Sequence, residues 1–140
     1  MEEGGRMNGA TVKVYSKAKD GSKALSANFK VREFACSDGS DTIFISPALV
    51  TVLQQIRDHF KAPVTINSGY RTDHHNDRTK DAAKFSQHKY GTAADITVKG
   101  VAPKDVAEYA ETILVGMGGI GIYKSFTHID VRKTKSRWNG

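Results

Sequence analysis

The segment between Ser46 and Pro63 constrains the fold of this chain more than any other. Ser46 is a residue type that caps helices, and Pro47 follows at the first helical position, where its missing N–H costs nothing. Pro63 closes the segment, because a helix does not continue through proline. Apolar residues recur at helical spacing along one face: Leu49, Leu53, Ile56 and Phe60. The segment therefore predicts an amphipathic helix that ends before Pro63 and packs one face against a core.

The other regular elements are predicted from short apolar segments bounded by turns. Strands are predicted at "TIFI", "PVTINSGY", "AADITVK" and "THIDVR", and a second helix is predicted from Pro103 onward. Residues 71–87 are polar and poorly periodic, which is typical of a functional loop. This order of elements indicates an α+β fold in which helices pack on one face of an antiparallel sheet.

The length of 140 residues fits one domain, which we place at residues 26–140. Residues 1–25 are predicted to be a flexible N-terminal arm or tail. The first ten are acidic and glycine-rich, and residues 11–25 offer at most a short edge strand before the polar stretch "KDGSK".

Composition excludes several classes of protein. No apolar run approaches the roughly 18 residues that a membrane span needs, and the N-terminus lacks the apolar core of a secretory signal. The single cysteine, Cys36, excludes an internal disulfide and fits synthesis in a reducing cytoplasm. The net charge of +6 suits an anionic partner or simply a solvated basic surface. The sequence has no basic–aromatic pattern that would indicate nucleic-acid binding.

Histidines and aspartates near two predicted strands are the candidates for chemistry. In "SQHKYGTAAD", Gly91 permits a turn that brings His88 toward Asp95, and imidazole and carboxylate are both zinc ligands. A cap or turn hydrogen bond would explain the same two residues equally well. In "THID", His128 and Asp130 project to the same face of a strand and could supply a third ligand. Taken alone, that pair fits a half-buried strand with two polar residues on its solvent-exposed face.

The remaining histidines are weaker candidates. His59 lies near the end of the first helix, where a cation complements the helix dipole, so it is expected to be structural or exposed. His74 and His75 are neighbours in the polar loop. Neighbouring residues on an extended chain point to opposite sides, so at most one of them is expected to approach a site.

Three blocks of the sequence resemble a known family. "SQHKYGTAAD" matches the pattern S-x-H-x-x-G-x-A-x-D, the metal motif of the zinc D-alanyl-D-alanine carboxypeptidase family. "INSGYRT" resembles that family's S-G-Y-R segment, and "IGIYKSFTHIDVRKTKSRW" looks like the closing strand of its H-x-D-ended branch. The resemblance runs from about Phe29 to Trp138. The family includes peptidoglycan endopeptidases, phage endolysins and vancomycin-resistance dipeptidases, and it shares its fold with the hedgehog signalling domain.

The resemblance implies a role for each matched residue. His88, Asp95 and His128 become zinc ligands, and Asp130 takes the role of general base or of a partner that orients His128. The opposite assignment, with Asp130 as ligand and His128 assisting catalysis, stays open. Arg71, in "SGYRT", corresponds to the arginine that faces substrate.

Two further residues are expected near the site, and one position departs from the family's pattern. Ser86 is expected to set the loop geometry and, with Tyr90, to lie at the substrate cleft. Many relatives carry an acid three residues before the final histidine, and Ser125 occupies that position here.

The function that the resemblance implies is that of a monomeric zinc metallopeptidase acting on peptidoglycan stem peptides. It would be a D,D-carboxypeptidase or an endopeptidase, with a phage or prophage lysin as one form, made without a signal peptide and acting on the cell wall. The alternative is a catalytically inactive zinc-binding module for cell wall or protein. Ser125 favours that alternative, and the presence of Arg71 argues against it.

Overall fold

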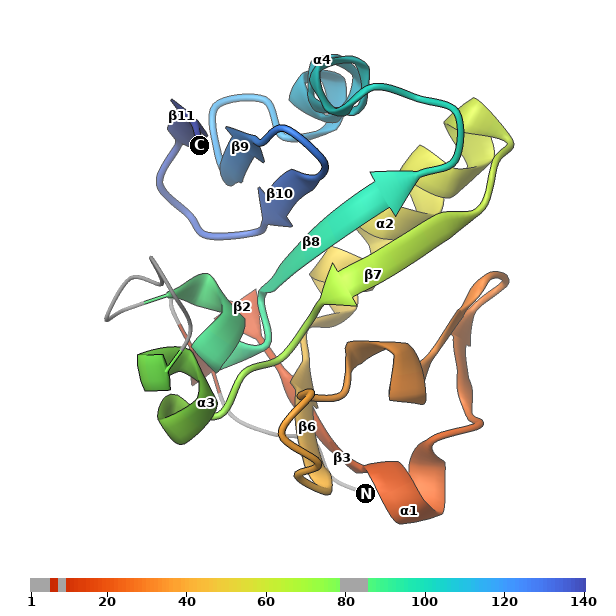
Figure 1. The fold of residues 1–140 in the computed structure, drawn as a ribbon, viewed down its shortest axis with the longest axis vertical. Helices are drawn as coiled ribbons and strands as arrows, with labels where there is room; N and C mark the ends of the chain where they lie inside the picture. Colours follow the sequence, from red (N-terminus) through yellow and green to blue (C-terminus); the bar gives the residue numbers. More distant parts are fainter. Residues whose placement is uncertain (1–5, 8–9, 79–85) are drawn as a thin grey trace.

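A five-stranded sheet forms the centre of the protein in the computed structural model, which describes residues 6–7, 10–78 and 86–140. The strand order is β11-β9-β10-β8-β7 (Figure 1). In chain order these strands are β7 (Val64–Ser68), β8 (Ala93–Val98), β9 (Gly119–Ile122), β10 (Thr127–Asp130) and β11 (Ser136–Asn139).

The sheet is antiparallel except at one edge. β8 pairs with β7 on one side and β10 on the other, and β10 pairs with β9, all antiparallel. β11 pairs with β9 in parallel, through Trp138 opposite Gly121. The predicted α+β class and antiparallel sheet are confirmed. β9 and β11 were not predicted from the sequence. Glycines interrupt the apolar pattern of β9, and polar residues interrupt that of β11.

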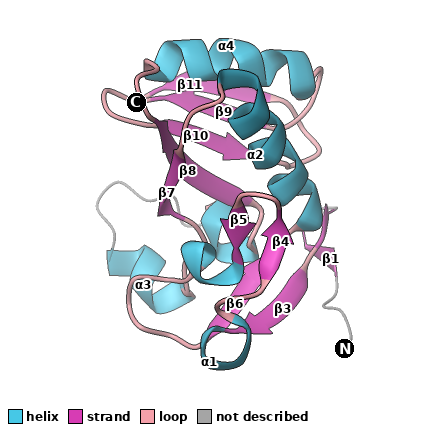
Figure 2. Cartoon of the chain, turned by 90° about the vertical axis from the view of Figure 1, so that its right-hand side faces the viewer, coloured by secondary structure: helices cyan, strands magenta, loops and turns pink. Residues whose placement is uncertain are grey.

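Two helices, α2 (Pro47–Phe60) and α4 (Pro103–Ile113), cover the same face of this sheet (Figure 2). Strand residues that point toward them are buried and belong to one hydrophobic core: Ala94, Ile96, Val98, Ile120 and Ile129. Because side chains alternate along a strand, Asp95, His128 and Asp130 project from the opposite face. The hydrophobic core and the polar candidates therefore occupy opposite faces of the same strands.

The helix predicted between Ser46 and Pro63 is confirmed as α2. The Ser46 hydroxyl accepts a hydrogen bond of 3.4 Å from the Leu49 N–H, and Pro47 is the first helical residue. Leu53 and Ile56 are fully buried. The helix stops at Lys61, which adopts the left-handed conformation at φ 52°. α4 likewise begins at Pro103, as predicted.

Residues 10–25 differ from the predicted arm. They include β2 (Ala10–Thr11), β3 (Lys13–Ser16), the short helix α1 (Lys17–Asp20) and most of β4 (Ala24–Ser26). β3 pairs with β6 (Thr42–Ile45), and Val12 is 1% exposed, so apolar residues of this stretch join the packed structure. Residues 1–5 and 8–9 of the predicted arm lie outside the described part, and the boundary near residue 26 stays a prediction.

The remaining described elements are short. β1 (Arg6–Met7) pairs with β2, and β4 pairs with β5 (Phe29–Lys30). The 3₁₀ helices are η1 (Val31–Phe34) and η2 (Gln87–Tyr90), and α3 spans Asp73–Arg78 within the predicted polar loop. Residues 79–85 of that loop lie outside the described residues. Among the helices that are described, none is long and apolar enough to cross a membrane.

Candidate metal centre

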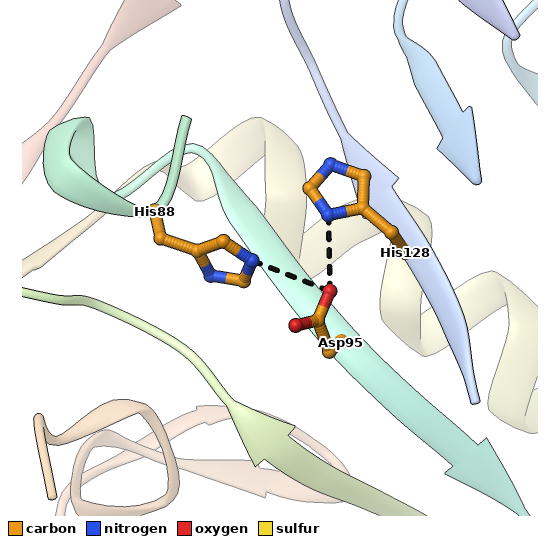
Figure 3. A group of neighbouring side chains, drawn as sticks. All are labelled: His88, Asp95 and His128. Atoms are coloured by element: carbon orange, nitrogen blue, oxygen red, sulfur yellow. Dashed lines mark hydrogen bonds and ion pairs between the residues drawn. The ribbon is translucent and has the colours of Figure 1, made fainter. Parts of the chain in front are cut away.

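Three side chains from distant parts of the sequence converge on the face of the sheet opposite α2 and α4, which we call the open face. His88 comes from η2, Asp95 from β8 and His128 from β10 (Figure 3). The Asp95 Oδ1 atom lies 3.2 Å from His88 Nε2 and 3.0 Å from His128 Nδ1. One donor atom of each residue lies within 4.8 Å of the other two, and all three residues are buried. Asp95 and His128 face each other directly across the β8–β10 pair.

A tight turn holds His88 in this position. The Ser86 hydroxyl accepts a hydrogen bond of 3.2 Å from the His88 N–H at the start of η2. Gly91 ends η2 at φ +75°, a left-handed conformation that favours glycine. A Cβ atom at Gly91 would collide with the backbone carbonyl of Phe44, so the turn packs directly on β6. The Ser46 N–H also donates to the Gly91 carbonyl at 2.9 Å. Ser86 thus sets loop geometry, as predicted.

The outer nitrogen of each histidine is occupied by a hydrogen-bond acceptor. His88 Nδ1 lies 2.8 Å from the carbonyl oxygen of Gly69, and His128 Nε2 lies 2.7 Å from Asp130 Oδ2. Because a carbonyl or an ionised carboxylate only accepts, both of these nitrogens donate. When the rings are neutral, His88 Nε2 and His128 Nδ1 therefore carry lone pairs and face the Asp95 carboxylate.

That arrangement requires protons or a metal ion between the three groups. Two lone pairs and a carboxylate oxygen repel one another unless protons or a metal ion lie between them. Zn²⁺ fits the donor set, because two imidazoles and a carboxylate leave one tetrahedral position open. The 3.0 and 3.2 Å separations are close to the ~3.3 Å between ligand atoms of a tetrahedral zinc site.

The protonation of His88 and Asp95 also suits a metal. Burial lowers the pKa of His88, which favours the neutral imidazole that binds metals. Burial alone would raise the pKa of Asp95, but hydrogen bonds from His128 and His88 outweigh it and hold that pKa well below its usual range. Burial would lower the pKa of His128, yet its bonds to Asp130 and Asp95 raise it overall. Proton and metal therefore compete chiefly for His128.

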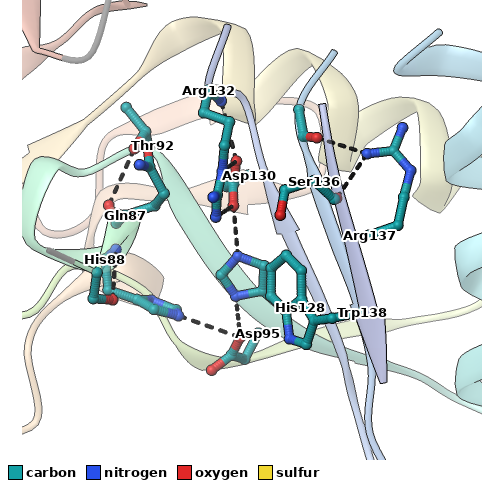
Figure 4. Close-up of polar contacts among 12 residues, drawn as sticks. Gln87, His88, Thr92, Asp95, His128, Asp130, Arg132, Ser136, Arg137 and Trp138 are labelled. Carbon is teal, nitrogen blue, oxygen red and sulfur yellow. Dashed lines mark hydrogen bonds and ion pairs between the residues drawn. The ribbon is translucent and has the colours of Figure 1, made fainter. Parts of the chain in front are cut away.

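Asp130 lies behind His128, away from Asp95 (Figure 4). Its carboxylate also accepts bonds from the Arg132 guanidinium at 2.6 and 2.9 Å and from the Arg132 N–H at 3.1 Å. A Cβ atom at Gly119 would collide with the carboxylate, so glycine at that position makes room for it. Asp130 is 0% exposed. This placement favours the orienting role for Asp130 over those of ligand and general base.

Replacing Asp130 with asparagine is expected to weaken zinc binding about 10–100-fold, the usual effect of removing a partner that orients a metal-bound histidine. The lost charge weakens the bond to His128 Nε2 and leaves Arg132 without its carboxylate. Zinc affinity measured by competition with a chromophoric chelator tests this. Asp105→Asn, at an exposed position in the first turn of α4, is the control, and an equal loss in both variants would contradict the prediction.

Arg71 reaches the edge of the same group from the segment after β7. Its guanidinium donates to Asp95 Oδ2 at 3.4 Å and to Ser68 Oγ at 3.1 Å, and its side chain is 12% exposed. A third bond of 3.3 Å goes to Asn76 Oδ1, and Asn76 is 2% exposed. The burial of Asn76 was not predicted, because a polar residue in an aperiodic loop gives no signal of burial.

The other candidates lie outside this group. His75 Nε2 lies 3.2 Å from Ser37 Oγ, and His59 stacks on Tyr109 with 3.7 Å between ring centroids. The side chain of His74 lies outside the described residues. Tyr90 ends η2 and is half-buried. Ser125 is exposed in the turn between β9 and β10.

Known proteins are similar to this chain in sequence. The sequence model described as Peptidase M15 matches residues 27–130. The peptidoglycan L,D-endopeptidase MepK of Escherichia coli (strain K12) is 33% identical over 94 residues, covering 61% of this chain and 50% of the relative. MepK of Escherichia coli O157:H7 and of Shigella flexneri match with the same values. The chain thus spans about half the length of the curated relatives it matches.

Proposed function

This chain belongs to the peptidase M15 family, and we propose that it is a zinc-dependent peptidase that hydrolyses peptide bonds in bacterial peptidoglycan. The observation that carries the proposal is the buried His88–Asp95–His128 group, in which each histidine has its outer nitrogen bonded to an acceptor. Within the described part of the chain this is the one group of three such side chains that could hold a metal.

These three residues would hold a zinc ion, which would supply Lewis acidity and lower the pKa of a water molecule to about 7. The residues of the chain keep this centre in one geometry. The Gly69 carbonyl orients His88, Asp130 orients His128, and β8 carries Asp95 on a strand paired on both sides. Burial excludes bulk water and so strengthens each of these interactions.

Arg71 is proposed to bind substrate beside the metal. Its guanidinium is anchored by Ser68 and Asn76 and lies 3.4 Å from Asp95 Oδ2. Such a donor can polarise a scissile carbonyl, stabilise the oxyanion that develops there, or hold a substrate carboxylate. Tyr90 and Ser86, which flank His88 in sequence, are proposed to border the same cleft.

The name of the relatives supports an endopeptidase more than a carboxypeptidase, since MepK is named as a peptidoglycan L,D-endopeptidase. We therefore propose cleavage within a stem peptide or cross-link, in the cell wall, by a monomer. Removal of a terminal D-alanine is the competing reaction. Ser125, at the position where many relatives carry an acid, favours a zinc-binding module without catalysis as the second candidate.

Mass spectrometry of purified peptidoglycan incubated with the zinc-loaded protein tests the proposal. New fragments that disappear when a zinc chelator is added support a peptidase, and their masses identify the bond. Intact peptidoglycan of several chemistries, with zinc bound at one equivalent, would overturn catalysis and support the binding module.

Replacing Arg71 with alanine is expected to lower kcat/KM by roughly 100-fold or more while zinc stays bound, because one positioned donor to a developing oxyanion contributes about that much. Initial rates on a defined stem peptide and metal analysis of the same sample measure both quantities. The matched control is Arg32→Ala, which removes an exposed arginine of η1. Wild-type rates for Arg71→Ala would exclude the proposed role.

A further inference from the structure

The C-terminal strand β11 contributes a side chain to the metal centre. The Trp138 ring lies 4.9 Å from the His128 ring, centroid to centroid, at an interplanar angle of 50°. Both residues lie on the open face of the sheet (Figure 4). We propose that Trp138 is a positioning residue for His128, so that β11 is part of the zinc site rather than only an edge of the sheet.

The indole is itself fixed in place. Trp138 pairs with Gly121 on β9, and a Cβ atom at Gly121 would lie 2.5 Å from the indole, so glycine is what allows the ring to cover this strand. The Trp138 Nε1–H donates to the hydroxyl of Tyr123 at 2.8 Å. Tyr123 in turn stacks on Phe126, with 4.4 Å between ring centroids. The indole therefore has little rotational freedom and presents a fixed surface to His128.

Arg132 links the indole to the carboxylate that binds His128. Its guanidinium carbon lies 5.5 Å from the centroid of the Trp138 ring, within cation–π range, while its nitrogens bind the Asp130 carboxylate. Asp130 accepts the bond from His128 Nε2. His128 is thus held at its outer nitrogen by Asp130 and along its ring by Trp138, and Arg132 joins the two supports.

In this arrangement the Nδ1 side of the imidazole, which faces Asp95, is the side that neither Asp130 nor Trp138 holds. Rotation of His128 away from the metal would require it to break the bond to Asp130 and to displace the indole. A ligand that is held before metal binding loses less conformational freedom when the metal arrives, which raises affinity. Trp138 is therefore expected to contribute to zinc affinity in addition to any contribution to stability.

Arg137, the neighbour of Trp138 in β11, allows the two contributions to be separated. It points to the other face, where it donates to Glu111 Oε2 at 2.7 Å and to the Leu114 carbonyl at 2.9 Å. Arg137→Ala therefore loosens β11 without touching His128. Trp138→Ala removes the contact with His128, and Trp138→Phe retains an aromatic ring at that position.

The experiment measures zinc affinity by chelator competition and thermal unfolding of the zinc-free protein for these three variants. Trp138→Ala is expected to bind zinc about 10-fold or more weakly, Trp138→Phe to recover most of that loss, and Arg137→Ala to lower Tm with unchanged zinc affinity. Unchanged zinc affinity in Trp138→Ala would overturn the inference. So would an equal loss in Arg137→Ala, since the effect would then follow the stability of β11.

A measurement on the unmodified protein covers the case in which Trp138→Ala does not fold. Trp138 is the single tryptophan of the chain, so tryptophan emission reports on the surroundings of this one ring. Adding zinc to the zinc-free protein is expected to change that emission in proportion to zinc uptake measured by equilibrium dialysis. Uptake with unchanged emission would overturn the inference.

This inference rests on the proposed zinc site, and the two fail in different ways. Absence of zinc uptake by the wild-type protein would overturn the proposed function. Normal uptake that is insensitive to Trp138 would overturn only the role of β11.

Discussion

Replacing Asp95 with alanine is expected to abolish tight zinc binding and to reduce peptidoglycan hydrolysis to the level of the chelator-treated protein. The Asp95 Oδ1 atom lies within 3.2 Å of the facing nitrogen of both histidines, so its removal leaves two imidazoles and no anionic ligand. Two neutral nitrogens alone do not complete the three-ligand set of a catalytic zinc site. Metal analysis after dialysis and muropeptide release measure the two losses.

The matched control for Asp95→Ala is Thr97→Ala, two residues along β8 on the same face but exposed. Thr97 bonds to Asn67 and to the Ser125 carbonyl and contacts neither histidine through a hydrogen bond. It is expected to bind zinc and hydrolyse peptidoglycan like the wild type. One equivalent of zinc and chelator-sensitive hydrolysis in Asp95→Ala would contradict the proposed ligand set.

Replacing Gly91 with alanine is expected to destabilise the fold and to weaken zinc binding together. The left-handed conformation at φ +75° costs an alanine about 1–2 kcal/mol, and the added Cβ also collides with the Phe44 carbonyl. Relief of that collision moves η2 away from β6 and carries His88 with it. The loss in free energy of unfolding should therefore exceed 1–2 kcal/mol, measured by denaturant titration of the zinc-free protein.

Gly100 provides the control for Gly91, because it has nearly the same backbone angle, φ +76°, with nothing within 4 Å of an added Cβ. Gly100→Ala is expected to lose only the conformational cost and to retain zinc affinity. The difference between the two variants isolates the contact with Phe44. Equal losses in both variants would show that the close packing of the turn on β6 contributes nothing.

Local signals in the sequence were sufficient for the two long helices and for the strands that carry the candidate ligands Asp95 and His128. The hydroxyl of Ser46 and the ring of Pro47 act on backbone groups within one turn, so α2 begins where these residues predict. β8 and β10 were predicted from runs of apolar and β-branched residues, which act through burial of one strand face. His88 and Asp95 were singled out because Gly91 permits the turn between them.

The N-terminal stretch shows where local signals fail. Only Val12 and Val14 alternate before the chain turns polar, which is too short a pattern to distinguish an arm from a paired strand. β3 exists because β6, 26 or more residues further along the chain, offers it a partner. Pairing of that kind depends on the arrangement of the whole fold, and no single segment encodes it.

The roles of His128 and Asp130 were likewise undecided in the sequence. Both project from the same face of one strand, and each carries a group that can bind zinc. Their surroundings differ: β8 places Asp95 opposite His128, whereas Gly119 and Arg132 enclose Asp130. Asp95 and Gly119 come from the strands on either side of β10, and Arg132 lies directly after β10 itself.

The sequence by itself determined the fold class, the two long helices and the residues from which a metal site could be built, because capping, alternation and motif spacing act over a few residues. Only the tertiary structure decided which nitrogen of each histidine faces inward, that Asp130 lies behind His128 and that Trp138 covers it. These outcomes depend on hydrogen-bond acceptors and ring contacts brought together from separate segments. Sequence spacing carries no information on the distances between such groups.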